Sequence, residues 1–478
     1  MRPERLFLAG CTTLLFFAGV VAPASSAPVT WPGTPAGRHA QAWLQAFNSG
    51  EEAAMRKMLL GHFAARALAA APVEARLGRM RQNRAQAGGA FTPVRVVEAD
   101  ASFVRLVAKD GTGAWVKLDF LCEERAPFGL VGIRLGEIDD PGAVGPRPPA
   151  LAAAELPASF DAYLAERARA EEFAGVVLVA RNGTPVFRKA YGIAERRFGA
   201  PVREDTRFNL GSLCKLFTKL GVAQLAEQGR LRLDDTLERW LPDWPKESGR
   251  KITLDMLVEH RAGTTDFFNE RYQRMDRSTL RHNRDYVALF RDDSLWFEPG
   301  TSQRYSNGGF VLLGEVVARA SGEDYYDYLR GHVFEPAGMK GTDSYEADDP
   351  TPDVAMGYYH EGDGPLRENV YTRPARGSAA GGGYSTVDDL LRFEQALRGA
   401  KLAGPAWSRW VLGGPRPGPG SADGPMPDAY SLAGGARGIT ASLAHRGEWT
   451  LVVLSNLDRG IMGKVENQLQ EWLDGVKE

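Results

Sequence analysis

The chain has 478 residues, 44% of them hydrophobic and 25% charged, and a formal net charge of −2 at pH 7. Its length exceeds that of one ordinary hydrophobic core, so we expect two or more domains. The balanced charge gives no support for a nucleic acid or an anionic membrane surface as a partner.

The N-terminus has the pattern of an export signal. Two arginines in "MRPER" precede the apolar run "LFLAGCTTLLFFAGVVA", and "PASSA" supplies the small residues of a cleavage site. We therefore predict a signal peptide over residues 1–27, a periplasmic or secreted location, and no membrane span after its removal. "LAGC", which ends at Cys11, resembles a lipoprotein box, but most of the apolar run follows it, so soluble export is favoured.

Residues 28–140 predict a small α+β domain. Residues 36–88 have helical periodicity, with Trp43 and Phe47 four positions apart on one face. Between residues 91 and 138 the pattern changes to antiparallel strands, joined in one place by the turn "DGTG". The element order resembles the cone-shaped fold of nuclear transport factor type, and it offers no evident functional site.

Residues 141–157 are rich in proline and alanine and predict a linker, so residues 158–478 form the second predicted domain. Asn182-Gly183 indicates a hairpin between two strands. The segments "YSLAGGARGITASLAH" and "EWTLVVLSN" predict two more strands, and an amphipathic helix follows them. Strands at both ends of a long helical region predict one antiparallel sheet with helices packed on it.

Ser212 and Lys215 lie three residues apart in the apolar helical pattern "SLCKLFTKLGVAQLAEQG". This spacing lets the lysine Nζ reach the serine Oγ, and burial would lower the pKa of the amine and make it a base. The alternative is a helix-capping serine followed by a solvated lysine. A second S-x-x-K match, "SGRK" at 248–251, is polar and contains glycine, so we interpret it as a loop.

Tyr305 and Asn307 form a Y-x-N pattern on a predicted loop that follows Pro299-Gly300. Side chains at i and i+2 of a loop can face the same cleft. A tyrosine exchanges protons if a nearby cation lowers its pKa, and an asparagine can hold a substrate carbonyl or the lysine. The alternative is a packed aromatic residue and a helix-capping asparagine.

Five segments occur in a characteristic order: "GSLCKLFTKL", "ITLDMLVEHRAGTTDF", "PGTSQRYSNGG", "FEPAGMKGTDSY" and "GGGYSTVDDLLRF". Together they resemble the β-lactamase-related serine hydrolases, which comprise class C β-lactamases, D-alanyl-D-alanine peptidases and related esterases. The resemblance implies an α+β fold of β-lactamase/transpeptidase type, with an antiparallel sheet flanked by helices. It also implies that Ser212 is the acylated nucleophile, Lys215 its proton acceptor, Tyr305 a second general acid/base and Asn307 a substrate-binding amide.

The third motif of this family departs from its usual form. Where the family has K-T-G or H-x-G, this chain has Leu432-Ala433-Gly434. Gly434 and Gly435 preserve the backbone, so the Gly435 N–H is expected to complete an oxyanion hole with the Ser212 N–H. Leu432 cannot supply the positive charge. Arg437 is expected on the opposite face of a regular strand, unless a bulge at the two glycines redirects it.

Other residues support no competing chemistry. No G-x-S-x-G nucleophile elbow occurs, and we interpret His260 as part of a structural turn and His445 as part of a hairpin turn. Cys122 and Cys214 are expected to be buried free thiols. No metal-ligand spacing is present, so the sequence implies neither a metal site nor a cofactor.

These patterns predict an exported serine hydrolase that cleaves an ester or amide of a small molecule or peptide through an acyl-enzyme on Ser212. The missing cation favours an esterase over a dedicated β-lactamase. The alternatives are a catalytically weak binding protein of the same fold and a cell-wall D-amino-acid peptidase.

Overall fold

The structure is a computed structural model, and it describes residues 29–70, 72–138, 140–362, 364–418, 424–458 and 461–476. The predicted signal peptide and Cys11 lie outside these residues. Among the helices that are described, none is long and apolar enough to cross a membrane.

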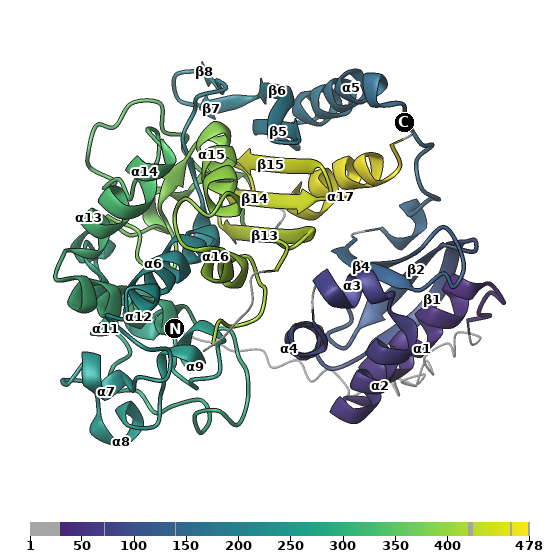
Figure 1. The fold of residues 1–478 in the computed structure, drawn as a ribbon. Helices are drawn as coiled ribbons and strands as arrows, with labels where there is room; N and C mark the ends of the chain where they lie inside the picture. The colour runs from purple at the N-terminus through teal and green to yellow at the C-terminus, as the bar shows by residue number, and fades with distance from the viewer. Residues whose placement is uncertain are drawn as a thin grey trace, which may run out of the picture.

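The N-terminal part consists of helices followed by an antiparallel meander (Figure 1). The sheet order is β1-β2-β3-β4, and one hydrophobic core lies between this sheet and the helices. Trp43 and Phe47 stack in that core with ring centroids 4.8 Å apart, as their spacing predicts. A relation to the cone-shaped fold stays a prediction. The elements are α1 (Pro35–Ser49), α2 (Glu52–His62), α3 (Ala65–Ala70), α4 (Val73–Gln86), β1 (Phe91–Ala99), β2 (Phe103–Asp110), β3 (Trp115–Cys122) and β4 (Leu130–Glu137).

The second part is built on a five-stranded antiparallel sheet of order β13-β14-β15-β5-β6. The first strand of this sheet in sequence, β5, pairs with the last strand, β15, in the interior of the sheet. Asn182 and Gly183 have φ values of 51° and 77° in the β5–β6 hairpin, as their dipeptide predicts. The strands are β5 (Gly175–Arg181), β6 (Thr184–Tyr191), β13 (Ala429–Ala436), β14 (Ile439–Arg446) and β15 (Trp449–Ser455).

The segment expected to form a single strand over residues 430–445 forms two, β13 and β14, with a turn at Arg437-Gly438. Gly438 has φ of 69°, which permits this reversal. His445 therefore lies inside β14, and not in a hairpin turn as expected. It is buried, and its Nδ1 lies 3.1 Å from Thr450 Oγ1 and 3.1 Å from Glu394 Oε1.

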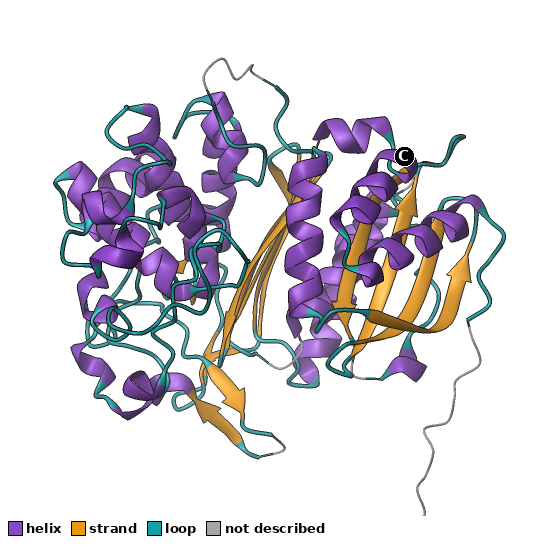
Figure 2. Cartoon of the chain, turned by 90° about the horizontal axis from the view of Figure 1, so that it is seen from below, coloured by secondary structure: helices purple, strands orange, loops and turns teal. Residues whose placement is uncertain are grey.

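Helices cover both faces of the five-stranded sheet. One face carries α5 (Leu156–Arg169) and α17 (Ile461–Asp474), which share a core with it. The other face packs on the larger helical core, which includes α6 (Lys215–Glu227), α12 (Asn307–Ser321), α15 (Val387–Arg398) and α16 (Pro405–Val411). Figure 2 shows this sheet edge-on between the two sets of helices.

Short elements complete the helical region. The helices are α7 (Leu237–Trp240), α8 (Lys246–Gly249), α9 (Leu254–Val258), α10 (Glu270–Arg274), α11 (Asn283–Val287), α13 (Tyr325–Leu329) and α14 (Glu335–Ala337). The strands are β7 (Ile193–Glu195), β8 (Ala200–Pro201), β9 (Phe208–Asn209), β10 (Tyr358–His360), β11 (Leu366–Glu368) and β12 (Tyr384–Ser385). Ser248 of the "SGRK" match lies in the one-turn helix α8, where a loop was expected, and Lys251 pairs with Glu298.

Helix α17 joins the two parts of the molecule, because it contacts β4 of one sheet and β14 and β15 of the other.

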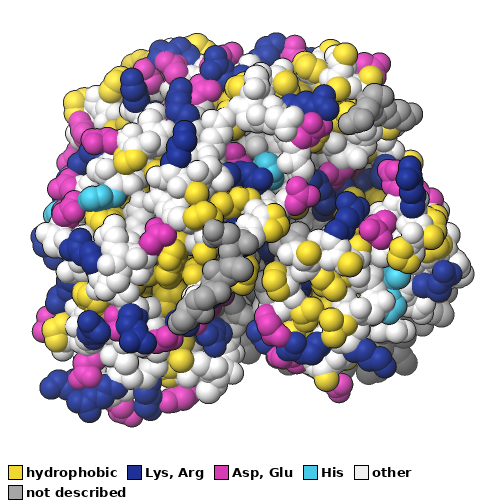
Figure 3. All heavy atoms as spheres, in the orientation of Figure 1, with side chains coloured by type: hydrophobic (Ala, Val, Ile, Leu, Met, Phe, Trp, Pro, Cys, Tyr) yellow, Lys and Arg dark blue, Asp and Glu magenta, His cyan; other side chains and the backbone are white. Residues whose placement is uncertain are grey.

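On the face drawn in Figure 3, lysine and arginine side chains are interspersed with aspartate and glutamate. Cys122 and Cys214 are both buried and free, as expected.

Candidate active site

Ser212 lies in a 3₁₀ turn, Gly211–Cys214, that leads directly into α6. The residues that cap these two helical segments are Leu210 and Cys214, so Ser212 is not a capping serine and that alternative is wrong. Its Oγ lies between two side chains, 3.1 Å from Lys215 Nζ and 2.8 Å from the Tyr305 hydroxyl. A hydroxyl held in this way has a proton acceptor and a proton donor in direct contact.

Lys215 is 9% exposed and has three neighbours for its amine. Asn307 Oδ1 lies 2.7 Å away and the Ala380 carbonyl oxygen 2.5 Å away, and both only accept hydrogen bonds. A neutral amine has two N–H groups and one lone pair. When it donates to these two oxygens, its lone pair remains for the Ser212 hydroxyl.

Burial lowers the pKa of Lys215 to about 7, and the negative charge of Asp266 opposes part of that effect. The amine is therefore uncharged in a large fraction of molecules near neutral pH. The same geometry that brings it to Ser212 thus also makes it a base.

Tyr305 immediately precedes the Ser306 cap of α12, and 38% of it is exposed. Burial raises the pKa of its phenol, which agrees with the absence of a cation at Leu432. Tyr305 is thus protonated at neutral pH and donates to Ser212 Oγ. This places a proton donor, and not a tyrosinate, beside Ser212 Oγ.

Asn307 begins α12, but the cap of that helix is Ser306, whose Oγ accepts the Gly309 N–H at 3.0 Å. The interpretation of Asn307 as a cap is therefore wrong. Its Oδ1 contacts Lys215, and its Nδ2 donates to Asp266 Oδ2 at 2.9 Å. The sequence allowed Asn307 to hold either the lysine or a substrate carbonyl. In the structure it contacts the lysine, and its role toward a substrate stays a prediction.

Two residues that contact this group were not found from the sequence. Asp266 lies six residues after His260 in "HRAGTTDF", and Ala380 belongs to the segment "SAAGGG". The run of three glycines was the available signal for Ala380, because glycines let backbone approach another segment closely. Nothing in the local pattern distinguishes Asp266 from a surface acid.

His260 has a structural role, as expected. It adopts φ of 55°, and its Nδ1 accepts the Ser306 N–H at 3.2 Å. Its ring centroid lies 4.6 Å from that of Tyr305, and burial lowers its pKa to about 3. The neutral imidazole therefore supports the loop that carries Tyr305.

The third motif lies on β13, next to the serine turn. A Cβ added to Gly434 would stand 2.0 Å from the Leu210 carbonyl oxygen and 2.9 Å from the Ser212 nitrogen. Only glycine permits so close an approach of strand and turn. Gly435 occupies the next position, and its part in an oxyanion hole stays a prediction.

The pairing of β13 with β14 runs without a register shift, so the bulge that could redirect Arg437 is absent. Arg437 instead contacts Glu361 at 3.6 Å and lies over the Tyr359 ring. Leu432 packs against the hydrophobic core. No side chain of this motif restores the missing cation.

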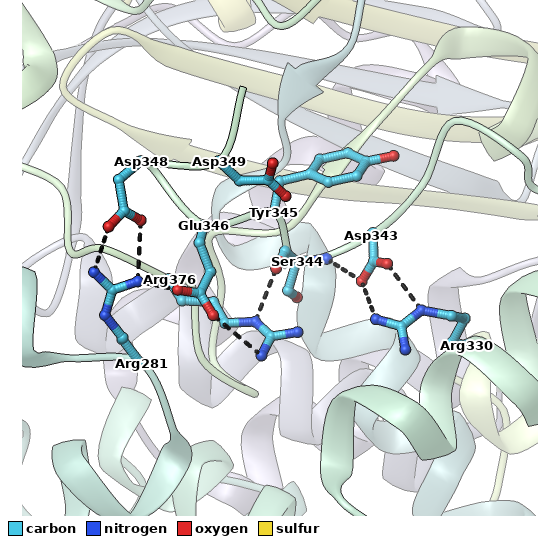
Figure 4. A pocket seen from close by; sticks show the side chains of 9 residues that line it. All are labelled: Arg281, Arg330, Asp343, Ser344, Tyr345, Glu346, Asp348, Asp349 and Arg376. Atoms are coloured by element: carbon cyan, nitrogen blue, oxygen red, sulfur yellow. Dashed lines mark hydrogen bonds and ion pairs between the residues drawn. The ribbon is translucent and has the colours of Figure 1, made fainter. Parts of the chain in front are cut away.

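A separate cavity of about 390 Å³ is lined mostly by charged side chains and by none of the predicted site residues. Figure 4 shows its arginines paired with acids, including Arg281 with Asp348 and Arg330 with Asp343. Among the residues described, no group of three or more histidine, cysteine, aspartate or glutamate side chains is arranged to hold a metal ion.

Comparisons with known proteins agree with this geometry. The family profile described as Beta-lactamase matches residues 160–469. Penicillin-binding protein 4* of Bacillus subtilis is 32% identical over 239 residues, which are 47% of this chain and 52% of that protein. Esterase EstB of Burkholderia gladioli is 31% identical over 284 residues, which are 52% of this chain and 71% of that protein.

Solved structures match the same fold. A penicillin-binding protein from Bacillus halodurans has a TM-score of 0.56 and 26% identity, and the match covers 64% of this chain and 97% of that one. D-amino acid amidase from Ochrobactrum anthropi has a TM-score of 0.55 and 24% identity, covering 67% and 98%. With a serine, a buried lysine and a tyrosine in contact, and with the profile matching more than half of its length, the chain belongs to the beta-lactamase family of serine hydrolases.

Proposed function

We propose that the protein is an exported hydrolase that cleaves an ester or amide lacking a recognised carboxylate, through an acyl-enzyme on Ser212. The observation that carries the proposal is the contact of Ser212 Oγ with both Lys215 Nζ and the Tyr305 hydroxyl. Lys215 removes the serine proton during attack on the carbonyl carbon, and the leaving group receives a proton from Tyr305 as it departs. The proton on Lys215 then returns Tyr305 to its neutral form. Water attacks the acyl carbonyl and gives a proton to Lys215, and that proton passes to Ser212 Oγ as the acid is released.

The oxyanion of the tetrahedral intermediate would be held by the backbone N–H groups of Ser212 and Gly435. The contact of Gly434 with the serine turn supports this role, because it brings the two backbone segments together. The position of Ser212 in the first helical turn adds N–H groups that have no partner within the helix.

The substrate class follows from the third motif, whose strand contacts the serine turn. Leu432 of this motif offers no charge to a substrate carboxylate. This favours a substrate that lacks a carboxylate. The similarity to an esterase supports the same assignment. The predicted signal peptide supports a periplasmic or secreted location for the reaction.

A fluorophosphonate probe tests the proposal. We expect it to label the wild-type protein at Ser212 and to leave the Ser212→Ala variant unlabelled. Intact-protein mass spectrometry after exposure to p-nitrophenyl esters, to penicillin and to a D-Ala-D-Ala peptide then reports which carbonyl class forms the adduct. A cell-wall peptidase would form its adduct with the last of these.

The absent cation also motivates the competing proposal, a catalytically weak relative whose cleft binds a ligand without turnover. A well-folded wild-type protein that takes up neither the probe nor any of the three substrates would support that binding protein and contradict the hydrolase.

A further inference from the structure

The carboxylate of Asp266 lies directly behind the Asn307–Lys215 contact. One oxygen, Oδ2, accepts the Asn307 backbone N–H at 2.8 Å and the side-chain Nδ2 at 2.9 Å. The other oxygen, Oδ1, accepts the Phe268 N–H at 3.2 Å, which fixes the carboxylate in its own turn. Asp266 itself is half-buried.

This arrangement determines which way the Asn307 amide points. A carboxylate only accepts hydrogen bonds, so the NH₂ end of the amide must face Asp266. The carbonyl end then faces Lys215, where Oδ1 lies 2.7 Å from Nζ. With the amide reversed, its NH₂ group would compete for the lone pair of the neutral amine that Ser212 needs.

Asp266 also contributes charge. The ionisable groups around the amine are Cys214, Tyr305, His260 and Asp266, and Lys219 acts on His260. Burial keeps Tyr305 and Cys214 protonated and His260 neutral, because it raises the pKa of the first two and lowers that of the third. Asp266 is the principal negative charge acting on Lys215, and it opposes the lowering of the lysine pKa by burial.

We propose that Asp266 is a positioning residue for the reaction: it locks the Asn307 amide with its carbonyl oxygen on Lys215, and it places a negative charge behind that amine. The inference rests on the proposed acylation of Ser212. It assigns Asp266 no contact with the substrate.

The test compares Asp266→Asn with the wild type by following acylation of Ser212 with a p-nitrophenyl ester from pH 5 to 10. We expect the maximal rate to fall about tenfold or more, because an amide at position 266 no longer dictates the orientation of Asn307. We also expect the acidic limb of the pH–rate profile, where the rate rises with pH, to move to lower pH by about one unit. Without the carboxylate, the lysine stays neutral at lower pH. A purely structural role would lower the rate and leave the limb in place.

Two further variants sharpen the comparison. Asp266→Glu keeps the charge and is expected to lower the rate while leaving the acidic limb near its wild-type position. Asp292→Asn removes an exposed acid that pairs with Arg291, and it should change neither quantity. If Asp266→Asn does not fold, Asp266→Ser removes the same charge with a smaller side chain and should also move the acidic limb to lower pH, whereas an unmoved limb would contradict the inference.

The same titration can be followed without turnover. In the Ser212→Ala background, the Lys215 amine is observed by NMR with and without Asp266→Asn. A lysine that titrates at the same pH in both proteins overturns the inference. If the wild-type protein shows no acylation at any pH, the proposed function fails instead, and the NMR comparison still reports on Asp266.

Discussion

The amine of Lys215 lies where its charge is poorly solvated, and in the proposed mechanism this property decides when Ser212 can react. Below a pH of about 7 the amine is protonated and has no lone pair for the Ser212 proton, and above that pH it is neutral. Burial raises the pKa of the Tyr305 phenol, so Tyr305 stays protonated in this range. In the proposed mechanism, the neutral fraction of Lys215 therefore controls acylation.

The pH dependence of Ser212 acylation should reflect the titration of this amine. The rate of Ser212 acylation should rise with pH along a limb with its midpoint near 7, since the reactive form is the deprotonated one. In Lys215→Arg the guanidinium does not deprotonate, so the rate should fall by about 10² to 10⁴ and the limb should vanish. Initial rates with a p-nitrophenyl ester measure both effects.

The control for this variant is Lys340→Arg, which changes an exposed lysine in the same way and should preserve the full profile. If Lys215→Arg still shows the rise in acylation rate near pH 7, another group is responsible for that titration. This result would contradict Lys215 as the base.

At the scale of elements, strand β13 and the serine turn are in direct backbone contact. Gly434→Ala introduces a methyl group 2.0 Å from the Leu210 carbonyl oxygen, so the strand must move away from the turn. We expect a loss of stability of about 1 to 3 kcal/mol and a fall in acylation of about 10² or more, since the predicted oxyanion hole opens. Urea unfolding and acylation rates measure these two effects.

Gly331→Ala is the matched control, because a methyl group there meets no atom within 4 Å. It should leave the acylation rate unchanged. An active Gly434→Ala variant with normal stability would show that the close contact is dispensable.

The same strand carries the departure from the family motif. Leu432→Lys restores a cation, which should lower the pKa of the Tyr305 phenol and attract a substrate carboxylate. We expect acylation by penicillin to increase about tenfold relative to a p-nitrophenyl ester. Leu432→Met, which adds no charge, should leave this ratio unchanged. An unchanged ratio in Leu432→Lys would mean that position 432 does not select against carboxylates.

At the scale of the whole molecule, the N-terminal sheet is joined to α17 by buried ion pairs. Glu471 on α17 lies 2.8 Å from Arg105 of β2 and also contacts Lys117 of β3. Arg105 in turn contacts Asp119 at 2.8 Å, and the side chains of Arg105, Asp119 and Glu471 are at most 6% exposed. Because α17 also packs on β14 and β15, these pairs tie the N-terminal part to the sheet that carries the third motif.

Glu471→Gln removes the negative charge from this junction and leaves buried cations with fewer partners. We expect a loss of about 3 to 5 kcal/mol in the stability of the junction. Calorimetry should then resolve the N-terminal part as a separate, earlier transition. Glu323→Gln, at an exposed pair with His332, is the control and should change stability by less than about 1 kcal/mol. One unsplit transition at the wild-type temperature in Glu471→Gln would contradict a structural role for the junction.

The sequence alone determined the features that depend on local spacing. The pair Ser212 and Lys215 meets because residues three apart share a helix face, and Asn182-Gly183 forms a hairpin because both residues accept positive φ. The ordered motifs fixed the family and with it the antiparallel sheet. The turn at Arg437-Gly438 was missed, because alternating apolar residues on both sides of it resemble one continuous strand.

The environment of the Lys215 amine depends on contacts between segments that are remote in the chain. Its other two partners, Asn307 and Ala380, lie 92 and 165 residues away in the chain, and Asp266 acts through the first of them. Desolvation and amide orientation arise where remote segments pack together. A helix repeat can bring an amine to a hydroxyl, but only the surrounding fold can remove the water and supply the acceptors that leave its lone pair free.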